Sequence, residues 1–135
     1  MTRLLPFFIA AWLISIPAAR AQLVPGGQSV PINISSSTTT QLVAASGSTR
    51  IFVTAWVAFA NAASNFNLEY GATIGGPCGV GATPLTGAYD FAAQSGISAA
   101  GGFQALYVVP AGYSLCAVTS GPSVSVAGSL SYIQY

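Results

Sequence analysis

The sequence predicts an all-β fold, an antiparallel β-sandwich or jelly roll of about eight strands, and three observations lead to this prediction. Short segments rich in Val, Ile, Thr, Tyr and Phe recur at near-regular spacing, and Gly, Pro, Ser or Asn separates them. Several of these segments alternate apolar and polar residues, which is the period of a half-buried strand. Beyond residue 21, apolar residues do not recur at helical spacing over any useful length.

The first 21 residues have the three-part layout of a secretory signal. Arg3 supplies a positive charge, residues 4–16 are almost wholly apolar, and Ala19 and Ala21 place small residues where a signal peptidase reads them. A membrane anchor is the alternative, but an apolar helix of this length reaches only about 20 Å across a roughly 30 Å hydrocarbon core. We therefore expect cleavage of a signal peptide, 1–21, and a secreted or periplasmic protein that no longer contacts the membrane.

The remainder divides into an arm and one domain. Residues 22–28 contain Pro25 and two glycines, which discourage regular structure, so we expect a flexible N-terminal arm. Residues 29–135 are enough for one hydrophobic core, and no change of composition marks a second domain. The predicted organisation is a signal peptide, an arm and a single β-sandwich domain.

The strands are expected in the following order. Val30, Ile32 and Ile34 alternate with polar or turn residues and predict the first strand, and Leu42 with Val43 predicts a short second one. Residues 49–60 form the strongest candidate strand, and the glycine-rich stretch 71–84 is expected to be a loop. Further strands are expected over 66–70, 85–91, 103–109, 113–119 and 124–135.

The strand predicted over 49–60 is apolar on both faces. Alternation sorts its side chains into one face with Ile51, Val53, Val57 and Phe59 and another with Phe52, Trp56 and Ala58. A single sandwich normally leaves the outer face of each sheet to water. The face with Phe52, Trp56 and Ala58 is therefore the candidate interface with another subunit.

Charged side chains are scarce. They make up 4% of the chain, against about 25% in ordinary soluble domains. After removal of residues 1–21 only Arg50, Glu69 and Asp90 remain, for a net charge of −1. Either hydroxyl and amide groups keep the surface wet or other subunits cover much of it, and the sequence leaves both open. One arginine without lysine cannot neutralise a row of phosphates, which argues against nucleic acid as a partner.

Cys78 and Cys116 are the only cysteines, an even number in a chain expected to be exported. We expect a disulfide between them, which closes a loop of about 39 residues and stabilises the fold by roughly 4 kcal/mol on the chain-entropy estimate. Two unpaired buried thiols are the alternative. Two cysteines without histidine fall short of the four ligands of a structural zinc, so we expect no metal and no other cofactor.

Catalytic groups are few. Histidine and lysine are absent, which removes the usual base of a serine or cysteine nucleophile. Glu69 and Asp90 lie in separate segments, so a glycosidase-like carboxylate pair is a weak hypothesis, and we expect no enzyme. A glycan could instead stack on exposed aromatic rings, although aromatic residues in strands are usually core. The aromatic candidates are Trp56, Tyr70, Tyr89, Tyr107, Tyr113, Tyr132 and Tyr135.

Four segments carry motifs in a distinctive order. They are TRIFVTAWVAFA (49–60), NLEYGATIGGPCGVGATPLTGAY (67–89), YVVPAGYSLCAV (107–118) and VSVAGSLSYIQY (124–135). This succession of a strand, a "YG" strand end, a Cys-bearing glycine loop, an "LTGA" turn, a "PAG" hairpin and a closing strand resembles small bacteriophage virion surface proteins of heads, tails or fibres.

The resemblance covers most of 29–135 and implies a β-sandwich or jelly-roll module, commonly a homotrimer. An export signal is not part of that pattern, so a secreted or periplasmic location and a virion surface are alternatives. The predicted function is a non-enzymatic, exported structural module that self-associates in a surface or virion-like assembly. The alternative is a secreted carbohydrate-binding module whose partner is a surface glycan.

Overall fold

A computed structural model describes residues 27–102 and 104–135, which form ten strands and no helix. The predicted signal peptide and residues 22–26 of the predicted arm lie outside the described residues. The strands are β1 (Gln28–Ile34), β2 (Thr38–Val43), β3 (Ile51–Ala60), β4 (Ser64–Ala72), β5 (Val80–Pro84), β6 (Tyr89–Phe91), β7 (Ser95–Ala100), β8 (Tyr107–Val109), β9 (Ser114–Ser120) and β10 (Val126–Gln134).

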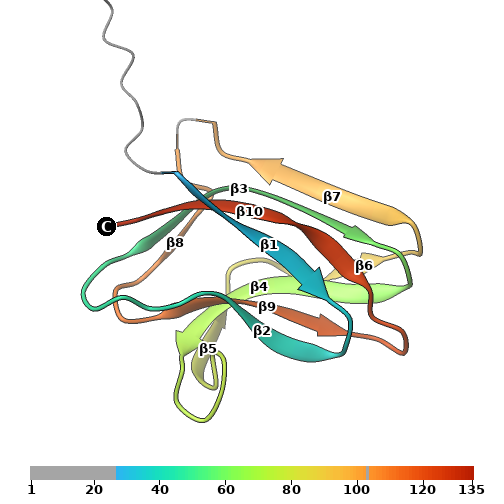
Figure 1. The fold of residues 1–135 in the computed structure, drawn as a ribbon, viewed down its shortest axis with the longest axis horizontal. Helices are drawn as coiled ribbons and strands as arrows, with labels where there is room; N and C mark the ends of the chain where they lie inside the picture. The colour runs from blue at the N-terminus through green and yellow to red at the C-terminus, as the bar shows by residue number, and fades with distance from the viewer. Residues whose placement is uncertain (1–26, 103) are drawn as a thin grey trace, which may run out of the picture.

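The strands form two antiparallel sheets that pack against each other (Figure 1). Sheet A has the order β1-β10-β3-β7, with β8 also paired to β3, and forms the upper layer of the figure. Sheet B has the order β2-β9-β4-β5, with β6 also paired to β4, and forms the lower layer. Because β1 pairs with β10, β2 with β9 and β3 with β8, the chain is wound as a jelly roll. The predicted all-β sandwich is confirmed.

Alternate side chains of the two sheets meet in one core. Sheet A contributes Ile32, Ile51 and Leu130, and sheet B contributes Phe66 and Leu115, all of which are buried. Burying one such side chain stabilises a fold by about 1.5–3 kcal/mol. Side chains between these positions on the same strands face outward, so each sheet has an outer face opposite the core.

A β-bulge in β3 changes which of its side chains face the core. Val53 pairs with Tyr132 and Ala55 with Ser131, so Thr54 is an extra residue without a partner on β10. An extra residue shifts the alternation by one. Ile51 and Val53 are buried before the bulge, and Trp56, Ala58 and Ala60 are buried after it. The predicted sorting of this strand into two faces was therefore wrong.

Two strands were not predicted, and one boundary moved. β5 lies in the stretch expected to be a loop, and β7 lies between two predicted strands. Both are edge strands made largely of Gly, Ala, Ser, Thr and Pro, and β5 is exposed along its whole length. β1 begins at Gln28, the last residue of the predicted arm.

Candidate functional site

The two carboxylates lie on the outer face of sheet B but are far apart. Asp90 pairs with Asn65 on β4, and Glu69 lies four residues further along the same strand. At about 3.3 Å per residue this separation is roughly 13 Å, whereas paired glycosidase carboxyls are about 5–9.5 Å apart. Partial burial raises the pKa of Glu69 above its ordinary value of 4.5, because desolvation disfavours the charged form. The structure does not bring the two acids together.

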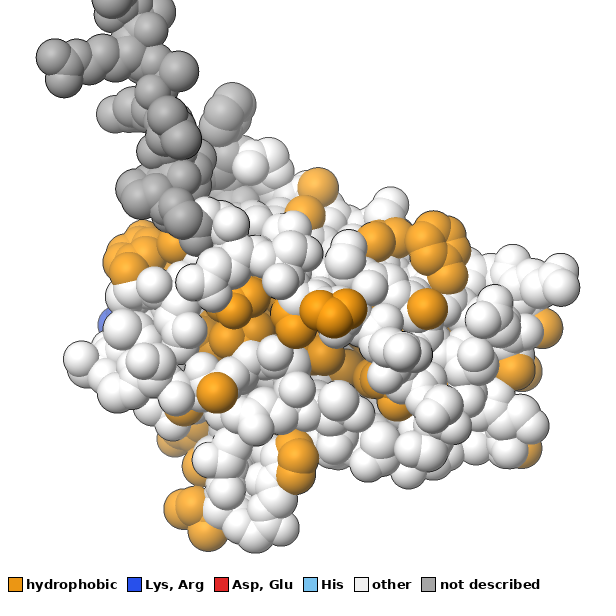
Figure 2. All heavy atoms as spheres, in the orientation of Figure 1, with side chains coloured by type: hydrophobic (Ala, Val, Ile, Leu, Met, Phe, Trp, Pro, Cys, Tyr) orange, Lys and Arg blue, Asp and Glu red, His pale blue; other side chains and the backbone are white. Residues whose placement is uncertain are grey.

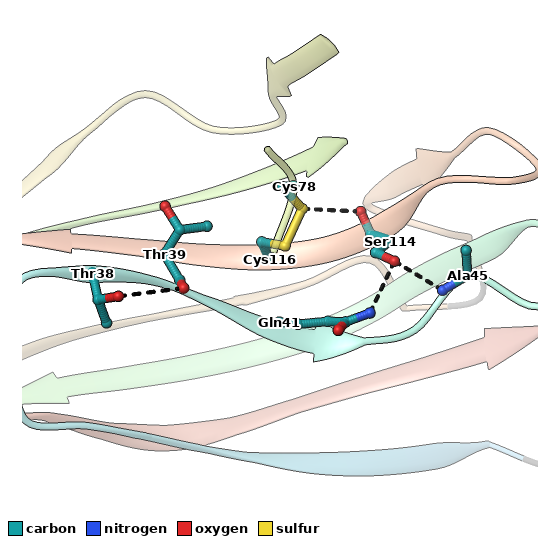
Figure 3. The surroundings of a disulfide bond; sticks show 7 residues. All are labelled: Thr38, Thr39, Gln41, Ala45, Cys78, Ser114 and Cys116. Carbon is teal, nitrogen blue, oxygen red and sulfur yellow. Dashed lines mark hydrogen bonds between the residues drawn. A yellow bond between two sulfur atoms is a disulfide. The ribbon is translucent and has the colours of Figure 1, made fainter. Parts of the chain in front are cut away.

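The predicted disulfide between Cys78 and Cys116 is present, and it lies on the outer side of sheet B (Figure 3). Cys116 is fully buried and Cys78 is 3% exposed. The loop that carries Cys78 rests on Gly71 of β4, where a Cβ would come within 2.9 Å of the Cys78 backbone. A larger residue at position 71 would push the loop away. The disulfide and Gly71 together hold the loop on the sheet.

Ser114 connects this region to the chain after β2. Its hydroxyl oxygen accepts hydrogen bonds from the Gln41 side-chain amide at 3.0 Å and from the Ala45 backbone N–H at 2.9 Å (Figure 3). The Cys78 sulfur lies 3.4 Å from the Ser114 carbonyl oxygen, which is a packing contact because a disulfide sulfur carries no hydrogen. The cluster ties three segments together and is structural.

The outer face of sheet A, which we call the A face, has a different chemistry. It is formed by the outward side chains of β1, β10, β3, β7 and β8, and its large apolar members are Phe52, Val57, Phe59, Val108 and Ile133. Glu69 and Asp90 lie on sheet B, whereas Arg50 pairs with Tyr135, whose ring stacks on Phe52. Among the charged residues in the described part of the chain, Arg50 therefore lies on the A face, at its Phe52 end. In Figure 2 the visible side chains are almost all uncharged, with one small blue area at the left edge.

The middle of the A face is hollowed by small side chains. Ala55 lies between Ala100 and Ser131 on the neighbouring strands, and Val57 lies between Ser98 and Ser129. A shallow depression of about 210 Å³ forms there. Its lining residues are Ala55, Trp56, Val57, Ser98, Ala99, Ala100, Ser129 and Ser131.

Bulky residues stand at the two ends of this hollow. At one end Phe59 is 57% exposed, and its ring lies over Gly96, since a Cβ at position 96 would overlap the ring. At the other end Phe52 stacks on Tyr135 with ring centroids 4.6 Å apart. Val108 pairs with Phe52 in register and is also exposed. The A face is thus a small-residue hollow between two aromatic ends.

The three predicted interface residues do not share one face. Phe52 lies on the A face, but Ala58 is fully buried and Trp56 is 2% exposed. Trp56 packs across the core, with ring centroids 5.7 Å from Phe66 and 5.6 Å from Tyr89 of sheet B. Placing Trp56 and Ala58 on an outer surface was wrong, because the bulge at Thr54 turns both side chains inward.

The residues that shape the A face were not predicted from the sequence. Phe59 was assigned to the opposite side of β3, and the serines of β7 and β10 were not singled out. One signal could have found part of the hollow: Ser129 and Ser131 alternate with the apolar Leu130 and Tyr132, which predicts a strand with a small-residue outer face.

The tyrosines are mostly packing residues. Four tyrosines, Tyr70, Tyr89, Tyr107 and Tyr132, pack against the core, whereas Tyr113 is 37% and Tyr135 72% exposed.

Within residues 27–102 and 104–135, no group of three or more His, Cys, Asp or Glu side chains could hold a metal ion. The same described part of the chain contains no helix long and apolar enough to span a membrane.

No protein-family model matches this sequence, and no curated protein matches it. Among solved structures, the chain is similar to a protein in the structure of infectious bursal disease virus Gx strain, with a TM-score of 0.44 and 15% sequence identity. The match covers 78% of this chain and 30% of the viral chain. This chain therefore spans less than a third of the length of that viral protein.

Proposed function

We propose that this protein is a non-enzymatic structural module that self-associates in an exported surface assembly or a virion-like assembly. The observation that carries the proposal is the contrast between the two outer faces. The A face exposes Phe59 and Val108 and carries one charged residue, Arg50, at its Phe52 end, whereas both acids, Glu69 and Asp90, lie on sheet B. Charged residues are depleted and aromatic residues enriched at the centre of protein interfaces, and a contiguous apolar face on a protein surface marks a contact site.

The scarcity of catalytic groups supports the non-enzymatic part of the proposal. Glu69 and Asp90 are the only carboxylate side chains after residue 21, and they lie too far apart to act on one bond. Both cysteines are in the disulfide, so neither supplies a thiolate. The acids serve better as hydrated groups that keep the outer face of sheet B in water.

The disulfide supports a location outside the reducing cytoplasm. Disulfides persist in secreted, periplasmic and surface-exposed proteins and are rare in the cytoplasm. The Cys78–Cys116 bond therefore fits export through the proposed signal peptide, 1–21. It also fits a virion surface on which the disulfide forms after release.

The mass of the protein in solution tests self-association. The full chain is expressed in a host with an export pathway, purified from the exported fraction, and measured by light scattering and sedimentation velocity from low to high micromolar concentration. We expect a mass above that of the monomer that rises with concentration, and a trimer if the resemblance to phage virion proteins extends to symmetry. A monomer throughout this range contradicts the proposal. Intact mass spectrometry of the same sample tests cleavage after residue 21.

Glycan binding is the second candidate, and the exposed rings of Tyr113 and Tyr135 favour it. Tyr113 meets Tyr70 edge to face at 5.6 Å, which leaves a ring surface beside the start of β9. A glycan array with the wild type and a Tyr113→Ala, Tyr135→Ala double variant tests this function. Hits that disappear in the double variant support it, and an array without hits contradicts it.

A further inference from the structure

We infer that a second copy of this chain covers the part of the A face that contains Phe59 and the small-residue hollow, and that Phe59 of each copy inserts into the hollow of the other. The inference rests on the proposed self-association and identifies the surface that performs it. The juxtaposition that carries it is a hollow lined mainly by Ala and Ser next to a projecting aromatic ring, in a part of the A face that carries no charged side chain. A surface with both a projection and a matching hollow can pair with itself.

Phe59 has the properties of an interface anchor. Its side chain is 57% exposed although it is aromatic, and its ring is supported from below by the backbone of Gly96. Such support limits the directions that the ring can take before association, which lowers the entropy lost on binding. Buried aromatic anchors that fill pockets account for most of the affinity of protein interfaces.

The hollow can accept this ring because Val57 is the largest outward side chain on its floor and the residues around Val57 are small. Ala55 and Ala100 present single methyl groups, and Ser98, Ser129 and Ser131 present single hydroxyl groups. At about 210 Å³ the depression is comparable in volume to one aromatic side chain. A ring seated there contacts methyl groups and serine Cβ atoms without displacing a charged group.

The spacing along β3 allows both copies to do this at once. Phe59 lies two residues from Val57 and four from Ala55, so the centre of the hollow is about 10 Å along the strand from Phe59, at 3.3 Å per residue. Consider a two-fold axis that lies in the plane of the contact, perpendicular to the strands, midway between Phe59 and the centre of the hollow. Rotation about this axis places Phe59 of each copy over the hollow of the other. The same residues then face each other from both sides, as a two-fold interface requires.

The contact is offset and of modest size. With strands about 4.8 Å apart and residues about 3.3 Å apart, the overlapping part of the A face measures roughly 16 by 20 Å. This is roughly 320 Å² on each copy, below the about 800 Å² per partner of a standard specific interface, so we expect a weak dimer with at best micromolar affinity. The end with Phe52 and Tyr135 lies outside the overlap. A two-fold contact gives dimers, in contrast to the three-fold assembly implied by the resemblance.

Sedimentation equilibrium with two pairs of variants of the full chain tests the inference. Phe59→Ser removes the anchor, and Ser98→Lys places a charge at the hollow. Ile74→Ser and Asn65→Lys are the matched controls, because Ile74 is 68% exposed on the disulfide loop and Asn65 is exposed on the outer face of sheet B. All four positions are exposed, so each variant should fold, which circular dichroism checks.

We expect Phe59→Ser and Ser98→Lys each to raise the dimer dissociation constant at least about 30-fold, the effect of losing one interface hot spot. The two controls should leave the dissociation constant within about threefold of the wild type, and so should Tyr135→Ser at the uncovered end of the A face.

A wild-type dimer that persists in Phe59→Ser and Ser98→Lys overturns this inference and leaves the proposed function standing. Loss of the dimer in Tyr135→Ser overturns the offset pairing. A monomeric wild type overturns both proposals, and glycan-array binding lost in Ser98→Lys would assign the hollow to a sugar instead.

Discussion

Gly128 lies at the closest approach of the two central strands of sheet A, opposite Ala58. A Cβ at position 128 would overlap the carbonyl oxygen of Val57 and lie 2.9 Å from its carbonyl carbon. The backbone of a central strand cannot move without disturbing the ladder on both sides. We therefore predict that Gly128→Ala lowers the free energy of unfolding by about 1–3 kcal/mol, as overpacking does in other cores. Urea unfolding, followed by the fluorescence of buried Trp56, measures the loss.

Gly87→Ala is the control for this prediction. Gly87 is exposed, and no atom lies within 4 Å of a Cβ built on it. The free energy of unfolding of this variant should stay within about 0.5 kcal/mol of the wild type, as for surface substitutions in general. If the Gly128→Ala variant is as stable as Gly87→Ala, the close approach of β10 to β3 does not constrain residue 128.

At the scale of elements, the pattern of β3 shows how far sequence periodicity reaches. Its run of β-branched and aromatic residues correctly predicted a strand, because such residues favour the pleated, extended backbone. The faces of Trp56 and Phe59 could not be predicted, because one bulged residue, Thr54, reverses the alternation after it. A bulge depends on the register with β10 and β8, which the local sequence does not specify.

The edge strands β7 and β5 could not be predicted from residue composition. Ser95–Ala100 is made of small residues with a single isoleucine, a composition that loops and edge strands share. Ser98 and Ala100 lie in a strand because their segment pairs with the backbone of β3. Three of the eight residues that line the hollow come from β7, so the site depended on a pairing that strand propensity does not encode.

The disulfide is the element-scale device that holds the Cys78 loop on sheet B. We predict that the Cys78→Ala, Cys116→Ala double variant is less stable by about 2–4 kcal/mol, because the unfolded chain regains the entropy of a loop of about 39 residues. The change is measured by urea unfolding of both proteins under non-reducing conditions. The A face lies on the other sheet, so the dimer dissociation constant should change little in the variant that remains folded.

Reduction provides an independent check of the same bond. Cys116 is fully buried and Cys78 nearly so, and thiol–disulfide exchange requires access to a sulfur atom. Reductant should therefore act slowly on the native protein and rapidly in urea. Equal rates in the two conditions, or a double variant as stable as the wild type, would show that the bond does not constrain the fold.

At the scale of the whole molecule, the small number of charged residues could be predicted from composition, but the distribution of these residues over the surface could not. Arg50, Glu69 and Asp90 are spread along the sequence, and only the strand order places both acids on sheet B. The hollow of the A face, which has no charged lining residue, follows from pairing between residues as distant as Val57 and Ser129. Composition therefore left open whether a neighbour covers part of the surface, and only the fold distinguishes the chemistry of the two outer faces.

The same shortage of titratable groups predicts an unusual dependence of stability on pH. No histidine or lysine is present, so side-chain titration should leave the free energy of unfolding nearly constant between about pH 6 and pH 9. Desolvation raises the pKa of Glu69 above 4.5 in the folded state. The folded protein then binds this proton more tightly than the unfolded chain, so the contribution of Glu69 to stability increases as the pH falls from the folded pKa toward 4.5 and is constant below it.

At alkaline pH the raised pKa of a tyrosine makes the free energy of unfolding decrease as the pH rises. Burial, with smaller contributions from the neighbouring Tyr107, raises the pKa of Tyr89 above 10.0 in the folded state. The unfolded chain then ionises first, so stability decreases as the pH rises through 10.

Urea unfolding between acidic and alkaline pH, at a protein concentration where the mass is constant, measures both effects. Glu69→Gln should remove the gain on acidification and leave the alkaline decrease unchanged, whereas Tyr89→Phe should do the reverse. A wild type that loses stability between about pH 6 and pH 4.5, as proteins with ion-paired carboxylates do, would contradict the role assigned to the desolvation of Glu69.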